Sequence, residues 1–205
     1  MMDRSASGIA RSIRLAREGR DEALSELLEA YRNYLRLMAA TCLSPEVRAK
    51  ADASDVVQET LLRAHQNFYQ FRGTTEREWI MWIRRILARN VAQLQRRFFL
   101  AGRRVSRERS LEASMDRSSL MMRTLVPARG PSPSQDAHER ELSVVLADAL
   151  AELEPEDREV VILRNLQELD WKEIGARTGR SPDAARMIWT RALQRMAPLL
   201  KERMS

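Results

Sequence analysis

The sequence predicts an all-α protein in which a flexible linker joins two helical domains. Glycine and proline are scarce, with seven of each in 205 residues, and no run of β-branched residues alternates with polar ones. Apolar residues recur instead at intervals of three and four, which is the spacing of amphipathic helices. A chain of this length forms one domain or two small ones, because domains usually have about 100–150 residues.

The composition argues against several kinds of site. Cys42 is the only cysteine, so an internal disulfide is impossible and a four-ligand zinc site has no support. Glycine is too scarce for a phosphate-binding P-loop, and neither His65 nor His138 has an indicated serine or cysteine partner. We therefore expect no enzyme and no cofactor. No apolar run approaches the roughly 20 residues that span a bilayer, and the N-terminus lacks a signal-peptide core, so we expect a cytoplasmic protein without membrane insertion.

The basic residues are almost all arginines. The net charge is +6, and only three of the 35 basic residues are lysines. The planar guanidinium suits phosphates and base edges, so this bias is compatible with nucleic-acid binding. A GC-rich genome that favours arginine codons explains the overall bias equally well. The clustering of the arginines is more informative than their number.

The first helical domain is predicted at residues 18–100, after an N-terminal extension at 1–17. Between residues 20 and 43, one apolar stripe with helical spacing is formed by Leu24, Leu27, Leu28, Tyr31, Leu35 and Met38. A polar break leads to a helix at 55–68, for which Asp52 or Ser54 is the expected N-cap. The apolar side of that helix carries Val57, Leu61, Ala64 and Phe68. Its polar side carries Asp55, Gln58 and Glu59.

A glycine-containing turn at 69–76 separates this helix from a basic one at 77–98, which Thr74 or Thr75 can cap. The apolar side of the basic helix consists of Trp79, Ile83, Ile86, Leu87, Val91 and Leu94. Aromatic residues beside arginines are what a protein needs to hold unstacked bases. Trp79 and Phe68 fall on apolar stripes and are expected in the core, whereas burial is less assured for Tyr69 and Phe71. A run of arginines by itself usually forms only a solvent-exposed face of a helix.

A linker is predicted at residues 101–138, because the segment 126–138 contains three prolines and no helical period. Within it, residues 110–125 have the pattern of a weak helix. Helical order returns at Glu139, with a stripe formed by Leu142, Val145, Leu146, Ala149, Leu150 and Leu153. The second domain is therefore predicted at 139–205, and Pro155 is well placed in the first turn of its next helix.

The second domain contains the pattern of a helix-turn-helix. Asp170 and Glu173 have the spacing of a capping box at the start of one helix. After a short turn, Ser181 is the expected N-cap of the last helix and Pro182 its first residue. Such a pair of helices, joined by a glycine-containing turn, commonly binds DNA, although the same geometry occurs in proteins that do not.

The last helix has a core side and a basic outward side. The expected core residues are Ala185, Trp189, Ala192, Leu193 and Met196, and the expected outward residues are Arg186, Met187, Thr190 and Arg191. The first residues of a recognition helix reach base edges in the major groove, so Arg186 is the best candidate base reader. Arg177 and Arg180 are better placed for phosphates. The basic outward face favours DNA binding.

Two segments resemble a known family. Residues 55–97, "DVVQETLLRAHQNFYQFRGTTEREWIMWIRRILARNVAQLQRR", resemble region 2 of bacterial sigma factors of the extracytoplasmic-function (ECF) type in the sigma-70 family. Residues 150–196, from "LAELEPEDREVV" to "TRALQRM", resemble their region 4. The resemblance covers about residues 18–99 and 139–200, in family order. The segments "FRGTTE…WIRRILARN" and "PSPSQ" resemble those of a variety of these sigma factors that is abundant in planctomycete-like bacteria.

The resemblance implies a promoter-recognition subunit that needs core RNA polymerase and promoter DNA. The "DVVQET" helix would dock on the β′ clamp helices, through Asp55, Gln58, Glu59 and Arg63, and region 4 would meet the β flap. The loop and helix that follow would meet the separated strands of the −10 element, through Phe71, Arg72, Gly73, Thr74, Arg84, Arg85, Arg89 and Asn90. The helix-turn-helix would read the −35 element, through Arg177, Arg180, Ser181, Arg186, Met187, Thr190 and Arg191.

The last helix departs from the family pattern. Sigma factors of this type commonly carry small polar and basic residues at its start, where this chain has "AARMIWTRA". Arg186 keeps a basic position, but Met187 and Ile188 replace a polar and a basic residue. We therefore expect an altered promoter sequence, read in part through thymine methyl groups. Members are often held by an anti-sigma protein that covers the polymerase-binding face, and the sequence identifies none.

The alternative is a stand-alone helix-turn-helix regulator whose first domain dimerises or senses a signal. Such a protein would bind a palindromic duplex tightly without polymerase. It would leave the acidic helix and the neighbouring arginine-rich helix unexplained.

Overall fold

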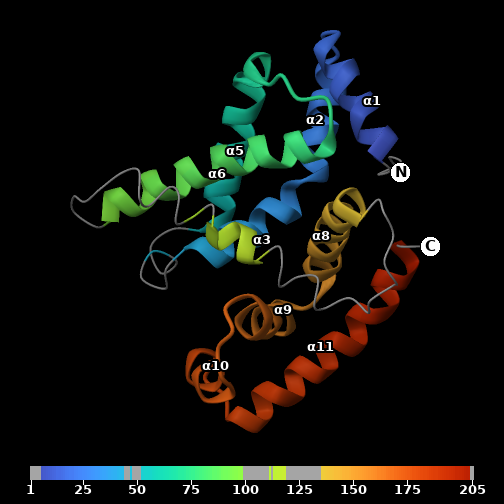
Figure 1. The fold of residues 1–205 in the computed structure, drawn as a ribbon. Helices are drawn as coiled ribbons and strands as arrows, with labels where there is room; N and C mark the ends of the chain where they lie inside the picture. Colours follow the sequence, from blue (N-terminus) through green and yellow to red (C-terminus); the bar gives the residue numbers. More distant parts are fainter. Residues whose placement is uncertain are drawn as a thin grey trace. The chain divides into compact units, whose positions relative to one another are not determined.

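The computed structural model of the chain describes residues 6–43, 47, 52–98, 111, 113–118 and 135–203, and every regular element in these ranges is a helix (Figure 1). The chain divides into two compact units. Residues 1–116 and 132–141 make up the first, and residues 117–131 and 142–205 the second. The predicted all-α fold class is thus confirmed.

The first unit is a helical bundle with a buried apolar core. Its elements are α1 (Ala6–Arg17), α2 (Asp21–Ala30), α3 (Arg32–Cys42), α5 (Ala53–Gln66), the short η1 (Phe68–Gln70) and α6 (Glu76–Phe98). Helix α1 packs on α2, and α5 packs against α2, α3 and α6. The largest fully buried side chains of the bundle include Tyr31, Tyr34, Leu27, Leu35, Met38, Trp79, Ile83 and Leu87.

The stripe between residues 20 and 43 is buried as predicted, but it belongs to two helices. The chain breaks at Tyr31, whose φ of −105° and ψ of 3° separate α2 from α3. The Tyr31 hydroxyl donates a buried hydrogen bond of 2.6 Å to Glu76 Oε1 at the start of α6. The side chain at the break therefore ties these two helices to the beginning of α6.

Helix α1 was not predicted, since residues 1–17 read as an extension. Its residues Ile9, Ile13 and Ala16 lie at intervals of four and three, and all three are buried. The helix ends before Gly19, whose φ of +86° is a conformation that glycine adopts without strain. The first unit therefore extends further toward the N-terminus than the sequence pattern indicated.

Cys42 ends α3 inside this unit and is 8% exposed. Burial is the main cause that raises the pKa of its thiol. Because the thiolate is the reactive form, we expect iodoacetamide at about pH 8 to alkylate the native chain at least roughly tenfold more slowly than the urea-unfolded chain. Mass spectrometry over time measures both rates. Equal rates in the two states would show that Cys42 is accessible and contradict this expectation.

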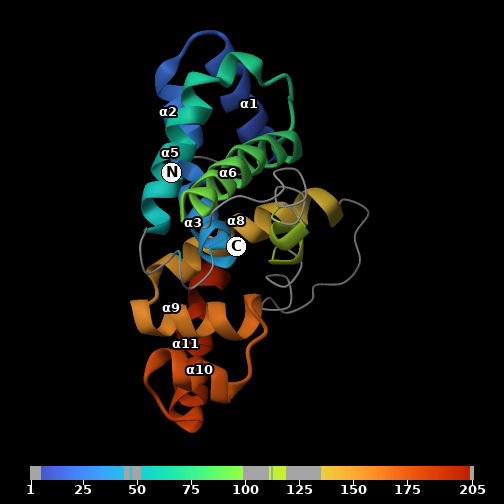
Figure 2. The same ribbon diagram turned by 90° about the vertical axis from the view of Figure 1, so that its left-hand side faces the viewer.

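The second unit contains most of α8 (Gln135–Glu152), then α9 (Pro155–Val161), η2 (Ile162–Leu166), α10 (Trp171–Thr178) and α11 (Pro182–Arg203) (Figure 2). The turn η2 is a π-helical continuation of α9. Helix α8 begins at Gln135, inside the predicted linker. Residues 113–118 are helical, within the segment read as a weak helix. The remaining linker residues 101–110, 112 and 119–134 lie outside the described ranges.

The core of the second unit joins α9 and α10 to α11. Its centre is formed by Val160, Leu163, Ile174, Ala185 and Ile188. Arg158 closes the end of α8 by donating to the carbonyl oxygens of Leu150, Ala151 and Leu153 at 2.6–2.8 Å. The last carbonyl groups of a helix have no N–H partner four residues further on, so the guanidinium satisfies groups that would otherwise depend on water; Leu150 O also accepts from Leu153 N at 3.3 Å.

Candidate protein-binding and nucleic-acid interfaces

Helix α5 buries one side and presents a polar face to solvent. The predicted cap is Asp52, whose carboxylate accepts a hydrogen bond of 2.8 Å from Ser54 N. The predicted contact residues Asp55, Gln58 and Glu59 are all exposed, as expected. Leu62 lies one turn further along and is 53% exposed, although the sequence pattern did not single it out. These four residues form an acidic surface with one apolar side chain, called the α5 face below.

Arg63 connects α5 to α6. Its guanidinium donates to Glu59 Oε1 at 2.5 Å and to Asn90 Oδ1 at 2.7 Å. Asn90 is 5% exposed, and its amide nitrogen donates to Thr60 Oγ1 at 2.9 Å. Both ends of the Asn90 amide are therefore used between the two helices, and its contact with DNA stays a prediction.

The loop from Phe71 to Thr75 is held at its N–H groups by Glu78. The carboxylate oxygen Oε2 accepts from Thr74 N at 2.8 Å, from Thr75 N at 3.0 Å and from Thr75 Oγ1 at 2.8 Å. Thr75 Oγ1 in turn accepts from Glu78 N at 3.3 Å, so Thr75 caps α6. The Thr74 N–H is the first cause that lowers the pKa of Glu78. These bonds therefore persist until the pH falls below the usual range of a glutamate.

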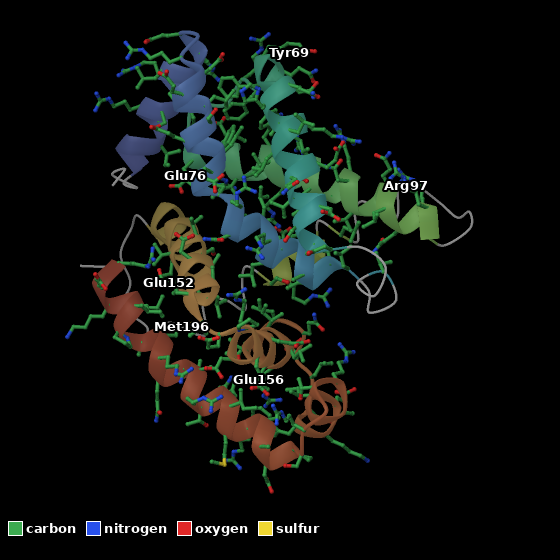
Figure 3. All side chains as sticks on the ribbon, turned by 180° about the vertical axis from the view of Figure 1, so that it is seen from behind. Tyr69, Glu76, Arg97, Glu152, Glu156 and Met196 are labelled. Atoms are coloured by element: carbon green, nitrogen blue, oxygen red, sulfur yellow. The ribbon has the colours of Figure 1, made fainter. Side chains whose placement is uncertain are left out.

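Phe71 is part of an aromatic cluster under this loop. Its ring is 4% exposed, and its centroid lies 5.4 Å from that of Trp79 and 5.2 Å from that of Trp82. The cluster also includes Phe68 and Tyr31. The Phe71 ring is thus covered by its neighbours in the protein alone, and its contact with DNA stays a prediction. Trp79 and Phe68 lie in the core as predicted, and Tyr69 is the aromatic that is exposed, at 70% (Figure 3).

Gly73 fits where no other residue would. A Cβ on it would lie 2.5 Å from Glu78 Cβ and 2.7 Å from Phe71 Cε2. The loop is therefore packed directly on the aromatic cluster at this point. The neighbouring side chains Arg72 and Thr74 are exposed, so the loop presents these two from a fixed backbone.

Arg17, at the end of α1, binds the backbone carbonyl groups of the same loop. Its Nη2 atom donates to Phe71 O at 3.2 Å and to Gly73 O at 2.5 Å. Sequence reasoning missed this residue because α1 itself was missed. The signal that was available is the spacing of Ile9, Ile13 and Ala16, which marks residues 6–17 as an amphipathic helix.

The arginines of α6 differ in their surroundings. Arg85 and Arg89 are exposed, as a DNA contact requires. The side chain of Arg84 is only 14% exposed and pairs with Asp116 at 2.7 Å. The Arg84 guanidinium is thus engaged within the protein, and its contact with DNA stays a prediction. Arg97, near the end of α6, is exposed and marks the far end of this basic helix (Figure 3).

The helix-turn-helix of the second unit has the predicted local geometry. Asp170 and Glu173 form the complete capping box, with bonds of 2.8 and 3.0 Å. Gly179 ends α10 with a φ of +66°. The Ser181 hydroxyl caps α11 by accepting from Ala184 N at 3.1 Å, and Pro182 is the first residue of that helix. Turn and caps thus fix the angle at which α11 starts.

The outward side of α11 carries exposed residues, and the Thr190 hydroxyl donates to Arg186 O at 3.0 Å. Arg186, Met187 and Thr190 are exposed, Met187 by 74%. Arg191 is bound to Asp157 Oδ1 at 2.8 Å, and Arg195 binds the other oxygen of that carboxylate at the same distance. Sequence reasoning missed Asp157, a fully buried acid on α9. It lies beneath two arginines whose side chains are still about half exposed.

Two other predicted phosphate ligands also have protein partners. Arg180 pairs with Glu156 at 2.7 Å, and Arg177 donates to Gln167 Oε1 at 3.1 Å. Both contacts are exposed at the surface. An exposed ion pair such as Arg180–Glu156 is worth little and can be exchanged for a phosphate. Trp189, predicted in the core, is half-buried, and its indole donates to Asn165 Oδ1 at 2.8 Å.

No group of histidine, cysteine and acidic residues among the described residues could hold a metal ion. None of the helices in the described ranges is long and apolar enough to cross a membrane.

Comparison with known proteins finds similarity in both units. Residues 143–196 match the family described as sigma-70, region 4. Over 161 residues, the chain is 31% identical to the RNA polymerase sigma factor CarQ of Myxococcus xanthus, covering 78% of this chain and 81% of CarQ. Over 129 residues, it is 34% identical to the ECF RNA polymerase sigma factor SigE of Mycolicibacterium smegmatis. That match covers 62% of this chain and 44% of SigE, so the chain spans less than half the length of that relative. A chain of the RsbN–BldN complex shares 21% identity with a TM-score of 0.31, over 91% of this chain and 98% of that one.

Proposed function

Because this chain belongs to the ECF sigma factors of the sigma-70 family, we propose that it binds core RNA polymerase and directs transcription initiation at specific promoters. One observation carries the proposal. In the first unit, α5 presents an exposed acidic face. Helix α6, which packs against α5, bears exposed arginines. One compact unit therefore offers both a surface for a basic protein and a surface for DNA. The protein acts by binding, without a reaction of its own, and in the cytoplasm where transcription takes place.

The α5 face is the proposed polymerase-binding surface. Its residues Asp55 and Glu59 supply acidic groups for the β′ clamp helices, and Leu62 supplies apolar area at the centre of the contact. Arg63 supports this face from the side, since it fixes the Glu59 carboxylate. An anti-sigma protein that covers the α5 face stays a prediction, as does the contact of the second unit with the β flap.

The loop from Phe71 to Thr75 and the exposed part of α6 are the proposed surface for the −10 element. Arg72, Gly73 and Thr74 would meet the captured base, while Arg85 and Arg89 follow the strand backbone. Tyr69, which is exposed beside the loop, is the aromatic available for stacking. Phe71, Arg84 and Asn90 support this surface from beneath, through the contacts described above.

The start of α11 is the proposed reader of the −35 element. Arg186 and Met187 project from its first two turns, and Thr190 follows one turn later. An arginine recognises guanine by two hydrogen bonds, and a methionine side chain suits a thymine methyl group. Arg177, Arg180 and Arg191 would hold phosphates on either side.

Replacing Arg186 with alanine should relax −35 selectivity without affecting polymerase binding. The expected loss is about 1–3 kcal/mol at one base position, if the guanidinium makes a bidentate contact with that base. Binding of the reconstituted holoenzyme to a set of single-base −35 variants measures it. Arg177→Ala is the matched control, because loss of a phosphate contact should weaken all sequences about equally. An unchanged ranking of the variants after Arg186→Ala would rule out this role.

Transcription in vitro tests the function as a whole. The purified protein is mixed with sigma-free core RNA polymerase and genomic DNA of its own source, and the 5′ ends of the transcripts are sequenced. Discrete starts that share two upstream elements at fixed spacing are expected. Absence of discrete starts, together with tight binding to a palindromic duplex without polymerase, would favour the stand-alone helix-turn-helix regulator instead.

A further inference from the structure

Helix α1 ends in a side chain that is bonded to the backbone of the loop before α6. Arg17 donates to Phe71 O and to Gly73 O from a single nitrogen, Nη2, across more than 50 residues of sequence. Its guanidinium carbon also lies 5.6 Å from the centroid of the Phe71 ring. The two carbonyl groups flank Arg72, so one side chain restrains the backbone on both sides of that residue.

The position of Arg17 is itself fixed. Ile9 and Ile13 are 4% and 1% exposed, and α1 packs on α2. The helix ends at Arg17, two residues before the left-handed Gly19. A basic residue in the last turn also interacts favourably with the helix dipole. The guanidinium is thus anchored to the bundle and not to the loop alone.

Glu78 restrains the N–H groups of the same backbone segment. Its carboxylate accepts the N–H groups of Thr74 and Thr75, while Arg17 donates to the carbonyl groups of Phe71 and Gly73. The positive charge of Arg17 is also among the causes that lower the pKa of Glu78. The loop is therefore held between two oppositely charged side chains from α1 and α6. The side chains of Arg72 and Thr74 stay exposed.

We propose that Arg17 is a positioning residue for −10 recognition: it sets the loop backbone so that Arg72 and Thr74 are presented in one conformation to the captured base. This inference rests on the function proposed for the loop. A loop that is ordered before binding loses less conformational entropy when the base enters, and so discriminates better. Helix α1, which the sequence pattern left as an extension, is by this inference part of the promoter-recognition surface.

The test uses the full-length chain with Arg17→Gln, Arg17→Lys and, as the matched control, Arg14→Gln. Arg14 lies on the same helix, is exposed and has the same charge. Each variant is reconstituted with core RNA polymerase. Its affinity is measured for the non-template −10 strand of a mapped promoter and for the same strand with an abasic site at the captured position. Hydrogen exchange of residues 71–75 is measured in the protein alone.

Arg17→Gln is expected to raise loop exchange and to lower the native-to-abasic affinity ratio by roughly tenfold, which is the scale of a lost charged hydrogen bond. Arg17→Lys should fall between Arg17→Gln and the wild type, and Arg14→Gln should match the wild type. An unchanged ratio in Arg17→Gln would overturn the inference and leave the proposed function standing. So would an equal loss for both strands, which indicates a phosphate contact. A wild-type holoenzyme that does not distinguish the two strands would overturn the proposed role of the loop, and this inference with it.

Discussion

Charge reversal of the α5 face, by Asp55→Arg together with Glu59→Arg, should lower the affinity for core RNA polymerase by about 3 kcal/mol or more, roughly 100-fold. Both carboxylates are exposed on one side of a helix whose other side is buried. Placing two positive charges opposite a basic partner replaces attraction by repulsion and leaves polar groups without partners. Transcription from every promoter of this protein should fall in parallel, since no holoenzyme forms.

Equilibrium binding of the labelled chain to core enzyme measures the effect. The single variants are informative because Glu59 also pairs with Arg63, so Glu59→Arg disturbs the contact between α5 and α6. Asp55→Arg has no such effect, beyond an unfavourable charge near the N-terminus of α5. Glu26→Arg on α2, an exposed position on another helix of the same unit, is the matched control. Wild-type affinity for the double variant would mean that the α5 face is not the docking surface.

The helices were largely predictable because each has an apolar stripe and a local start signal. Each capping side chain binds a backbone group within four residues of its own position. The caps are Asp52, the capping box of Asp170 and Glu173, and Ser181. The break at Tyr31 was not predictable from periodicity, since the apolar stripe continues through it. The bond from its hydroxyl to Glu76, 45 residues away, is a consequence of tertiary packing.

The candidate surfaces were predictable in outline and less so in detail. Periodicity separates exposed from buried positions on a helix, which is why Asp55, Gln58, Glu59 and Arg186 are exposed as expected. It says nothing about which exposed polar groups have partners far away in sequence. Asn90 is bonded to Thr60 across 30 residues, and Asp157 binds two arginines across 34 and 38. In a loop without periodicity, the burial of Phe71 depends on rings contributed by the next helix.

Trp79→Ala should reduce the free energy of unfolding of the first unit by about 3–5 kcal/mol. Trp79 is fully buried and contacts the rings of Tyr31, Phe68, Phe71 and Trp82. Removing the indole leaves a cavity that four rigid rings cannot collapse to fill. Because small domains are stable by only about 5–15 kcal/mol, such a loss would unfold a measurable fraction of the unit. Urea denaturation of the full chain, followed by far-ultraviolet circular dichroism, measures it.

Trp79→Phe separates the loss of the indole N–H from the loss of a ring in the cluster. The Trp79 indole nitrogen is buried and has no hydrogen-bond partner among the described residues. Phenylalanine removes that donor while keeping a ring in the cluster, so its cost should be well below that of Trp79→Ala. Trp82→Ala, at the half-buried edge of the cluster, should cost less stability. It should still impair −10 recognition, because Trp82 supports Phe71 and so the loop. If Trp79→Phe and Trp79→Ala were equally destabilising, a phenyl ring would not replace the packing of the indole, and the expected order of the two costs would be wrong.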